Sequence, residues 1–216
     1  ERGAIDFEMT QTQFIFDENR KLKTIEPRER NDAHRLIEEF MVAANVSAAQ
    51  FILKHDLPAL FRVHEAPAEE KLASLREFLG ELGLALGGGD EPEPAHYASL
   101  LKNAHKRPDA HLIQTVMLRS LKQAVYSPDN VGHFGLSLEA YAHFTSPIRR
   151  YPDLQVHRAI RHIISGKKKS TWPATHDEMV KLGEHCSMAS RRADEATRDV
   201  SDWLKCEFMQ ERVGEV

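Results

Sequence analysis

The sequence has few cysteines, few aromatic residues and no long hydrophobic run. Its 216 residues include two cysteines, Cys186 and Cys206, too few for a disulfide framework or a four-cysteine zinc site. A reducing cytoplasm is therefore the expected compartment. No apolar run approaches the ~20 residues that a membrane-spanning helix needs, and no signal-peptide pattern opens the chain. We therefore expect no membrane contact.

Several catalytic motifs are also missing. The twelve histidines show no H-E-x-x-H or other metal-ligand spacing, and no G-x-S-x-G motif is present. The glycine triplet at 87–89 lacks both the Lys-Ser/Thr of a P-loop and a preceding strand, which favours a flexible connector. These absences argue against a zinc enzyme, a serine hydrolase and a P-loop nucleotidase, and we expect no metal ligands in this chain.

The composition is that of a globular protein with one sizeable core or two small ones, since 41% of the residues are hydrophobic and 29% are charged. The net charge is −4, but residues 145–169 hold seven Lys or Arg and one acid. That window carries +6, so the rest of the chain carries −10. Its basic residues are Arg149, Arg150, Arg158, Arg161, Lys167, Lys168 and Lys169. A local basic patch on an acidic protein can bind a polyanion.

Hydrophobic periodicity predicts an α+β chain dominated by helices. Alternating patterns predict short strands at 5–8, 13–16 and 22–25, and a short buried strand at 60–63. Helical spacing predicts helices that start near Asn31, Pro67, Asp109 and Pro152, of which the one from Asp109 reaches Val125. It also predicts a long last helix over 176–212. In the first helix the apolar stripe consists of Ile37, Met41, Ala44, Ala48 and Phe51.

The segment 145–151 (TSPIRRY) is the most informative part of the sequence. It places Arg149 and Arg150 just before a helix start, where unpaired backbone N–H groups and the helix dipole favour anions. Because guanidinium groups grip phosphate bidentately, one interpretation is a clamp on a phosphodiester. The other is a solvated basic turn. The nearby rings favour the clamp, because aromatic side chains can stack on bases; they belong to His133, Tyr141, His143 and Phe144.

Other polar positions allow two interpretations. Glu38 and Asn45 project from one side of the first helix and could bind sugar hydroxyls, or they could form a solvated face. Phe7 taken alone is expected in the core. The last helix alternates acids with bases, which is typical of an ion-paired surface; the residues are Arg191, Arg192, Asp194, Glu195, Arg198, Asp199, Asp202 and Lys205.

Longer motifs resemble the signature of the RNB family of exoribonucleases. The central one is HFGL at 133–136 followed by YAHFTSPIRRYPD at 141–153. The segments 2–8 (RGAIDFE), 30–39 (RNDAHRLIEE) and 192–200 (RADEATRDV) match as well, so the resemblance spans essentially the whole chain. It implies a mostly helical C-terminal part of an RNB catalytic domain over residues 1–213, with 214–216 starting a linker toward an S1-type RNA-binding domain.

The resemblance also implies a chemistry. Members of this family are processive hydrolases that degrade RNA from the 3′ end and release nucleoside 5′-monophosphates. Their aspartates hold Mg²⁺ at the bottom of a narrow channel for single-stranded RNA. Nothing in this chain matches that aspartate motif, which belongs to the first half of the domain. The expected partners are therefore that missing half, S1 or cold-shock-type domains and an RNA 3′ end.

Roles carry over where residues match. Arg149 resembles the catalytic arginine that contacts the scissile phosphate, and Arg150 would support the phosphate backbone. Phe7 resembles the aromatic residue that stacks on the terminal base, and Glu38 resembles the carboxylate that senses the ribose hydroxyl. The channel wall is expected to include Tyr141, His143, Thr145 and Ser146. One branch of the family has an acid where this chain has Thr197, so no role carries over there.

Two other hypotheses remain. The chain could bind RNA without catalysis, or it could be a scaffold whose basic patch contacts a protein. An aspartate-rich segment upstream would favour catalysis over binding alone. In either case we expect the isolated chain not to hydrolyse RNA.

Overall fold

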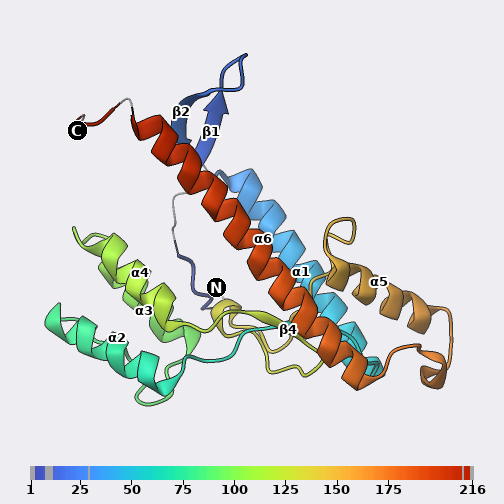
Figure 1. Ribbon diagram of the computed structural model, residues 1–216. Coiled ribbons are helices and arrows are strands. Elements are labelled where there is room, and N and C mark those ends of the chain that lie inside the picture. Colours follow the sequence, from blue (N-terminus) through green and yellow to red (C-terminus); the bar gives the residue numbers. More distant parts are fainter. Residues whose placement is uncertain (1–2, 8–11, 29, 211, 215–216) are drawn as a thin grey trace.

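A computed structural model describes residues 3–7, 12–28, 30–210 and 212–214. Helices dominate this part of the chain and two small antiparallel sheets complete it, as the predicted α+β class requires (Figure 1). The strands are β1 (Thr12–Phe16), β2 (Leu22–Pro27), β3 (Phe61–Val63) and β4 (Val125–Ser127). The helices are α1 (Asp32–His55), α2 (Glu69–Glu81), α3 (Pro94–Ala104), α4 (Ala110–Ser120), α5 (Tyr151–Ile164) and α6 (His176–Gln210).

The two hairpin strands near the N-terminus confirm the prediction, whereas the strand expected at 5–8 does not form in its described part. β1 pairs with β2 in antiparallel register, with Phe14 opposite Ile25. Residues 5–7 run as irregular chain, and the Ile5 N–H donates to the Gly135 carbonyl at 2.9 Å. Glu8 lies outside the described residues. The alternating apolar pattern of this short segment did not produce a strand, because its backbone forms a hydrogen bond with a loop and not with a neighbouring strand.

The α1 helix begins where the sequence predicts. Asn31 caps it, because its side chain accepts a hydrogen bond from the His34 N–H at 3.1 Å. Its C-terminal half is buried through Asn45, Ala48, Ala49 and Ile52. The predicted stripe is wrong for the N-terminal half, where Ile37 and Met41 are exposed with Leu36 and Phe40.

By length and mean hydropathy, α1 could cross a membrane, contrary to the expectation that no segment could. The same apolar composition also suits a helix that packs against protein. The C-terminal half of α1 does so, since Ala48, Ala49 and Ile52 join a cluster with Phe61, Val63 and residues of α5. A buried, hydrogen-bonded Asn45 on that face fits packing against protein better than lipid.

The long α6 helix packs its first turns on the second sheet. β3 and β4 pair in antiparallel register, with Arg62 opposite Tyr126, and α6 lies against β4. The contact is close at Gly183, where a Cβ atom would lie 2.5 Å from the Tyr126 carbonyl oxygen. A glycine is therefore required at this position for helix and strand to approach as they do.

A second core joins α2, α3 and α4. Leu72, Leu75 and Leu79 are buried as predicted, and they meet Tyr97 of α3 and Ile113 of α4. The α3 helix was not among the predicted helices, and it begins at Pro94, directly after the glycine-rich connector. The helix predicted to reach Val125 ends at Ser120, and Val125 begins β4 instead.

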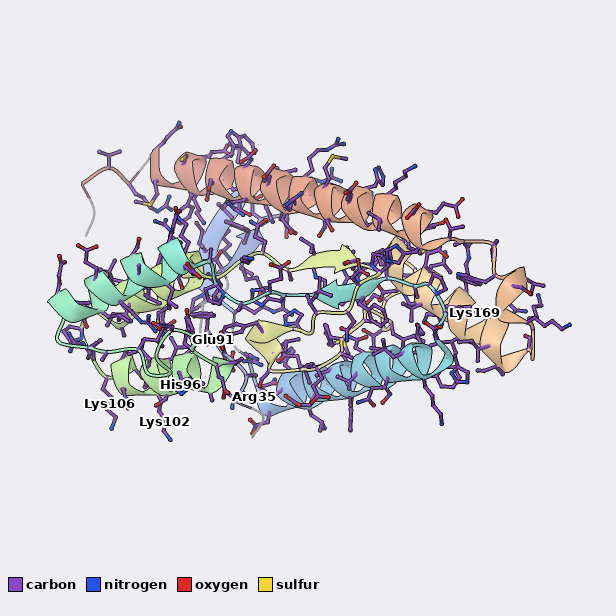
Figure 2. The ribbon with its side chains drawn as sticks, turned by 90° about the horizontal axis from the view of Figure 1, so that it is seen from below. Arg35, Glu91, His96, Lys102, Lys106 and Lys169 are labelled. Carbon is purple, nitrogen blue, oxygen red and sulfur yellow. The ribbon has the colours of Figure 1, made fainter. Side chains whose placement is uncertain are left out.

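Two views show how these parts are arranged around the small strands. Figure 2 shows α6 and α1 along opposite sides of the molecule, with the small strands between them. The second core lies at one end and α5 at the other (Figures 1 and 2). The irregular chain 133–150 runs through this middle region, and it carries most of the predicted site.

Candidate functional site

The loop that carries the two arginines is anchored to the core by one carboxylate. Asp153 in the first turn of α5 is wholly buried. Its Oδ1 accepts hydrogen bonds from the Ser146 N–H and from the Arg150 guanidinium, both at 2.7 Å. The Ser146 carbonyl in turn accepts from the backbone N–H of Arg150 at 3.0 Å. A buried carboxylate with these donors fixes the loop at the start of the helix.

The two arginines therefore differ. Arg150 is committed to Asp153 through an ion pair, and its side chain is only 23% exposed. The Arg149 side chain is exposed and forms no hydrogen bond or ion pair with any residue that the structure describes. The neighbouring Ile148 is 97% exposed, so the tip of this loop projects from the protein. Arg149 is thus the guanidinium that is free to bind a phosphate.

Behind this loop, α1 holds the segment 141–144 from one side. The Asn45 side chain donates to the Tyr141 hydroxyl and accepts from the Phe144 N–H, both at 2.9 Å. The side chain is 2% exposed. Asn45 is therefore a structural anchor. For this residue both predicted alternatives are wrong, the binding of sugar hydroxyls together with Glu38 and the solvated face. Tyr141 is buried as well, so its hydroxyl is not presented to solvent.

The histidines of the site are neutral. Burial, with the nearby charges of Arg150 and Arg62, lowers the pKa of His143 to about 3, and Nδ1 lies 2.8 Å from the Tyr126 hydroxyl. Burial and the neighbouring His64 lower the pKa of His133 to about 4. Their rings pack edge-on against Tyr141. They form a wall without charge, so the positive potential of the site comes from arginines.

Glu38 is linked through Arg30 to Asp6, the residue that precedes Phe7. Arg30 binds the Glu38 carboxylate through Nε, with 3.0 Å between Nε and Oε2, and it pairs with Asp6 at 3.3 Å. These bonds raise the pKa of Arg30. Phe7, next to Asp6, is half-buried against the second core. The Glu38 side chain is 42% exposed, so it can accept further hydrogen bonds.

Thr145 and Ser146 are half-buried and lie on the same loop as Arg149. The predicted basic patch is spread along α5, where Arg158 and Arg161 line one hollow with Lys167. Arg149 and Arg150 precede the 14-residue α5, whereas Lys167 to Lys169 follow it, about 20 Å away at 1.5 Å per residue. Lys169 lies at the far end of α1 (Figure 2) and pairs with Asp56 there.

Two residues of the site were missed in the sequence. Asp153 was counted only as the acid within a basic window. Arg62 lies on β3 with its guanidinium 4.7 Å from the centre of the Tyr126 ring, and its backbone N–H donates to the Tyr141 carbonyl at 2.8 Å. A charge inside the apolar run at 60–63 was a usable signal, because a buried strand rarely holds an arginine without a function.

The described residues do not form a metal site. No group of three or more His, Cys, Asp or Glu within residues 3–7, 12–28, 30–210 and 212–214 is placed to hold an ion. The donor set for Mg²⁺ that the family resemblance implies is therefore not among them. Asp153, the carboxylate closest along the chain to Arg149, is occupied by Ser146 and Arg150.

Comparison with known proteins finds similar sequences and similar structures. Ribonuclease R of Vibrio cholerae is 58% identical over 100% of the chain and 27% of its own length, and that of Escherichia coli is 55% identical over 100% and 28%. A structure of Mycoplasma genitalium RNase R with ribose-methylated single-stranded RNA superposes with a TM-score of 0.89 at 28% identity, covering 98% of this chain and 34% of that one. The chain thus spans about a quarter of the length of these curated relatives.

The family model of the RNB domain matches residues 1–166, which is most of the chain. The motifs at 133–153, 30–39 and 192–200 predicted this family, with ribonuclease R as a better fit than the related ribonuclease II, and the ribonuclease R relatives confirm the resemblance. The chain belongs to the RNB family.

Proposed function

We propose that this chain is the C-terminal part of the catalytic domain of a processive 3′→5′ exoribonuclease. The intact protein would hydrolyse single-stranded RNA to nucleoside 5′-monophosphates. The observation that carries the proposal is the contrast between Arg149 and Arg150. One guanidinium is locked to a buried carboxylate, and the other extends unpaired from the same anchored loop.

Arg149 is the catalytic residue in this proposal. A guanidinium held by a rigid loop can meet the scissile phosphate in a fixed place and stabilise the charge that develops during hydrolysis. Arg150 adds positive potential behind it while it holds the loop. The half-buried Thr145, Ser146 and His143 would form the wall of the RNA channel, with the buried Tyr141 ring packed behind His143.

Phe7 and Glu38 would handle the nucleotide at the 3′ end. A half-buried phenylalanine offers a ring on which a base can stack. The Glu38 carboxylate, oriented by Arg30, can accept a hydrogen bond from a ribose 2′-hydroxyl, which DNA lacks. The bridge from Glu38 through Arg30 to Asp6 would keep the two groups at a fixed separation.

Further parts of the protein would complete the site. The exposed apolar residues Leu36, Ile37, Phe40 and Met41 on α1 favour packing against another part of the RNB domain. We propose that residues 1–213 belong to that domain and that 214–216 start a linker to an S1-type domain. Mg²⁺ ligands would come from outside these 216 residues. A cytoplasmic location fits this activity.

RNA binding without catalysis is the second candidate. The exposed, unpaired Arg149 would serve this function as well, because binding a phosphate needs no hydrolysis. A protein scaffold is the third, but the unpaired Arg149 on a rigid loop is better suited to phosphate than to a variable protein surface.

The deciding experiment compares the full-length protein with the 216-residue chain on a labelled single-stranded RNA, with Mg²⁺ and with EDTA. We expect Mg²⁺-dependent release of nucleoside 5′-monophosphates by the full-length protein and none by the chain alone. RNA binding without any hydrolysis by the full-length protein would establish the second candidate. Strong hydrolysis by the chain alone would show that it holds a metal site of its own.

A further inference from the structure

The α6 helix crosses open space in its middle. Its buried residues end at Ser187, and every residue over 191–200 is exposed. Farther along, Leu204 and Phe208 are half-buried and α6 contacts β2 of the hairpin. The helix therefore spans from the second sheet to the first, and the space beneath it is not filled by the described residues.

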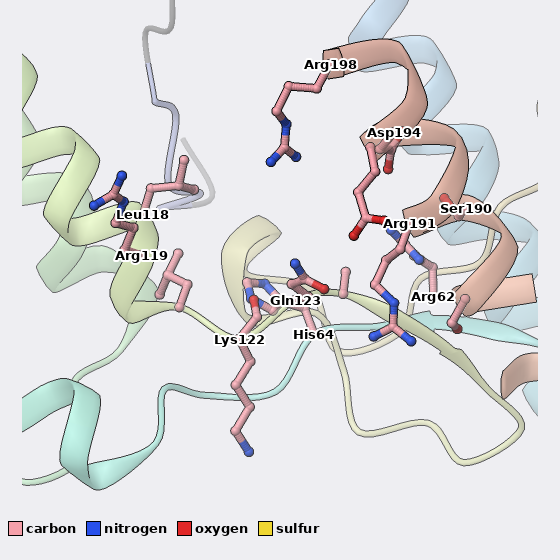
Figure 3. A pocket seen from close by; sticks show the side chains of 14 residues that line it. Arg62, His64, Leu118, Arg119, Lys122, Gln123, Ser190, Arg191, Asp194 and Arg198 are labelled. Atoms are coloured by element: carbon pink, nitrogen blue, oxygen red, sulfur yellow. The ribbon is translucent and has the colours of Figure 1, made fainter. Parts of the chain in front are cut away.

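That space is a hollow of about 590 Å³ between α6, β3 and the end of α4, which we call the α6 hollow. Figure 3 shows Arg198 extending from α6 into it, with Arg191 and Arg62 together beneath the helix. His64 and Gln123 lie on the floor (Figure 3). Its size is within the range of pockets that bind small molecules.

The α6 hollow is lined mainly by basic side chains among its charged residues. Five of its lining residues are basic and two are acidic; they are Arg62, Arg119, Lys122, Arg191 and Arg198 against Asp194 and Glu195. Lys122 pairs with Glu65. In the part of the chain that the structure describes, neither Arg191 nor Arg198 forms an ion pair within 4 Å, although the sequence predicted an ion-paired helix. Only Lys205 and Asp202 form such a pair between two residues of that predicted set.

Arg62 connects this hollow with the Arg149 loop. It lines the hollow, while its charge and that of Arg150 both act on His143. Burial lowers the pKa of Arg62, and the charge of Arg150 lowers it further, whereas Asp194 on the hollow side favours the charged guanidinium. Positive potential therefore continues from the loop, past Arg62, to the underside of α6, and it can guide an anion along this path.

We propose that the α6 hollow is a subsite for a ribonucleotide, in which Arg62, Arg191 and Arg198 bind the phosphate. Asp194 and Glu195 accept hydrogen bonds from the ribose hydroxyls. This inference rests on the proposed function and adds a second nucleotide-binding position, apart from the Arg149 loop. Unpaired guanidinium groups suit phosphate, and carboxylates beside them suit hydroxyl donors.

The phosphate has two possible sources. It is either the monoester of a released nucleoside 5′-monophosphate or a diester of the RNA strand. Both share the chemistry described, so they are separated by experiment. Adenosine 5′-monophosphate is the probe for the first source, and a single-stranded oligoribonucleotide is the probe for the second.

The test uses the full-length protein with the double substitution Arg191→Ala and Arg198→Ala. The matched control is Arg192→Ala with Lys205→Ala, which removes the same charge from exposed positions on α6 outside the hollow. Thermal unfolding confirms that both proteins are folded. Calorimetry measures AMP binding, and turnover in the presence of AMP measures product inhibition.

For a mononucleotide site, we expect the affinity for AMP and its inhibition of turnover to fall about tenfold or more in the test variant alone. For a strand site, AMP does not bind, but the affinity for RNA falls in the test variant. The slope of log K for RNA against log salt concentration also becomes shallower by about 1.4, because two phosphate contacts are lost. If the test and control variants bind AMP equally and bind RNA equally, the inference is overturned. The same result would follow if an acidic protein segment occupied the hollow. Because the control protein still degrades RNA in that case, the proposed function would stand.

Discussion

The Arg150 guanidinium donates a 2.7 Å hydrogen bond to Oδ1 of Asp153, a carboxylate that is wholly buried one turn along the chain. The same oxygen accepts the Ser146 N–H at 2.7 Å. Two arginines that are equivalent in sequence thus have separate tasks. Arg150 is bound to the interior of the protein, and Arg149 extends unpaired from the same loop among the described residues.

Replacement of Arg149 by alanine should lower turnover by about 10²–10³-fold, because the variant loses one donor to the transition state. RNA affinity should fall much less. Single-turnover kinetics and binding by the full-length protein measure both quantities. Arg158→Ala, which removes an exposed charge from α5, is the control. Equal turnover in the Arg149 variant and the parent would remove Arg149 from the mechanism.

Replacement of Arg150 by alanine should affect stability instead. It leaves the Asp153 charge buried without its cation, which typically costs about 3–5 kcal/mol. Arg149→Ala should change the free energy of unfolding by less than about 0.5 kcal/mol, since that side chain is exposed. Urea denaturation compares the two variants. Similar losses in both would contradict the division of tasks between them.

Replacement of Glu38 by alanine should narrow the preference for RNA over DNA, because the carboxylate that accepts the ribose hydroxyl is lost. The measurement is the ratio of degradation rates for matched RNA and DNA oligonucleotides. Glu26→Ala removes an exposed carboxylate from β2 and serves as the control. A ratio that stays fixed in the Glu38 variant would count against the ribose contact.

Replacement of Phe7 by alanine should change how the last nucleotides are handled, because the stacking surface for the terminal base disappears. The length of the shortest RNA product, resolved on a gel, reports this. Phe16→Ala removes an exposed ring from β1 as the control. If the end product keeps its length, Phe7 contributes only to packing against the second core.

Folding stability should fall as the pH drops below about 6.5. The folded-state pKa values of His143 and His133 are about 3 and about 4, so the unfolded chain binds more protons throughout this range. Stability is thus fully present above pH 6.5 and is lost toward pH 4, by up to about 1.4 kcal/mol per pH unit for each histidine. Urea denaturation between pH 7 and pH 5 measures the slope, and a flat profile would refute this prediction.

Much of the fold could be predicted because it depends on local patterns. The Asn31 cap, the leucine spacing of α2 and Pro152 in the first turn of α5 are signals within a few residues. The irregular chain at 133–150 has no period, so its course depends on distant partners. No spacing indicates that Asn45 bonds to Tyr141, 96 residues away. The missed role of Asp153 has the same origin, because burial is a property of the assembled core.

The burial of Asp153 has a consequence for how the protein would lose activity on unfolding. Its carboxylate is covered by the fold's interior, so the reactive loop keeps its shape only while α5 stays docked on α1. Heat or denaturant that undocks this helix would therefore release the loop. In the proposed enzyme, RNA cleavage should be lost whenever α5 separates from α1.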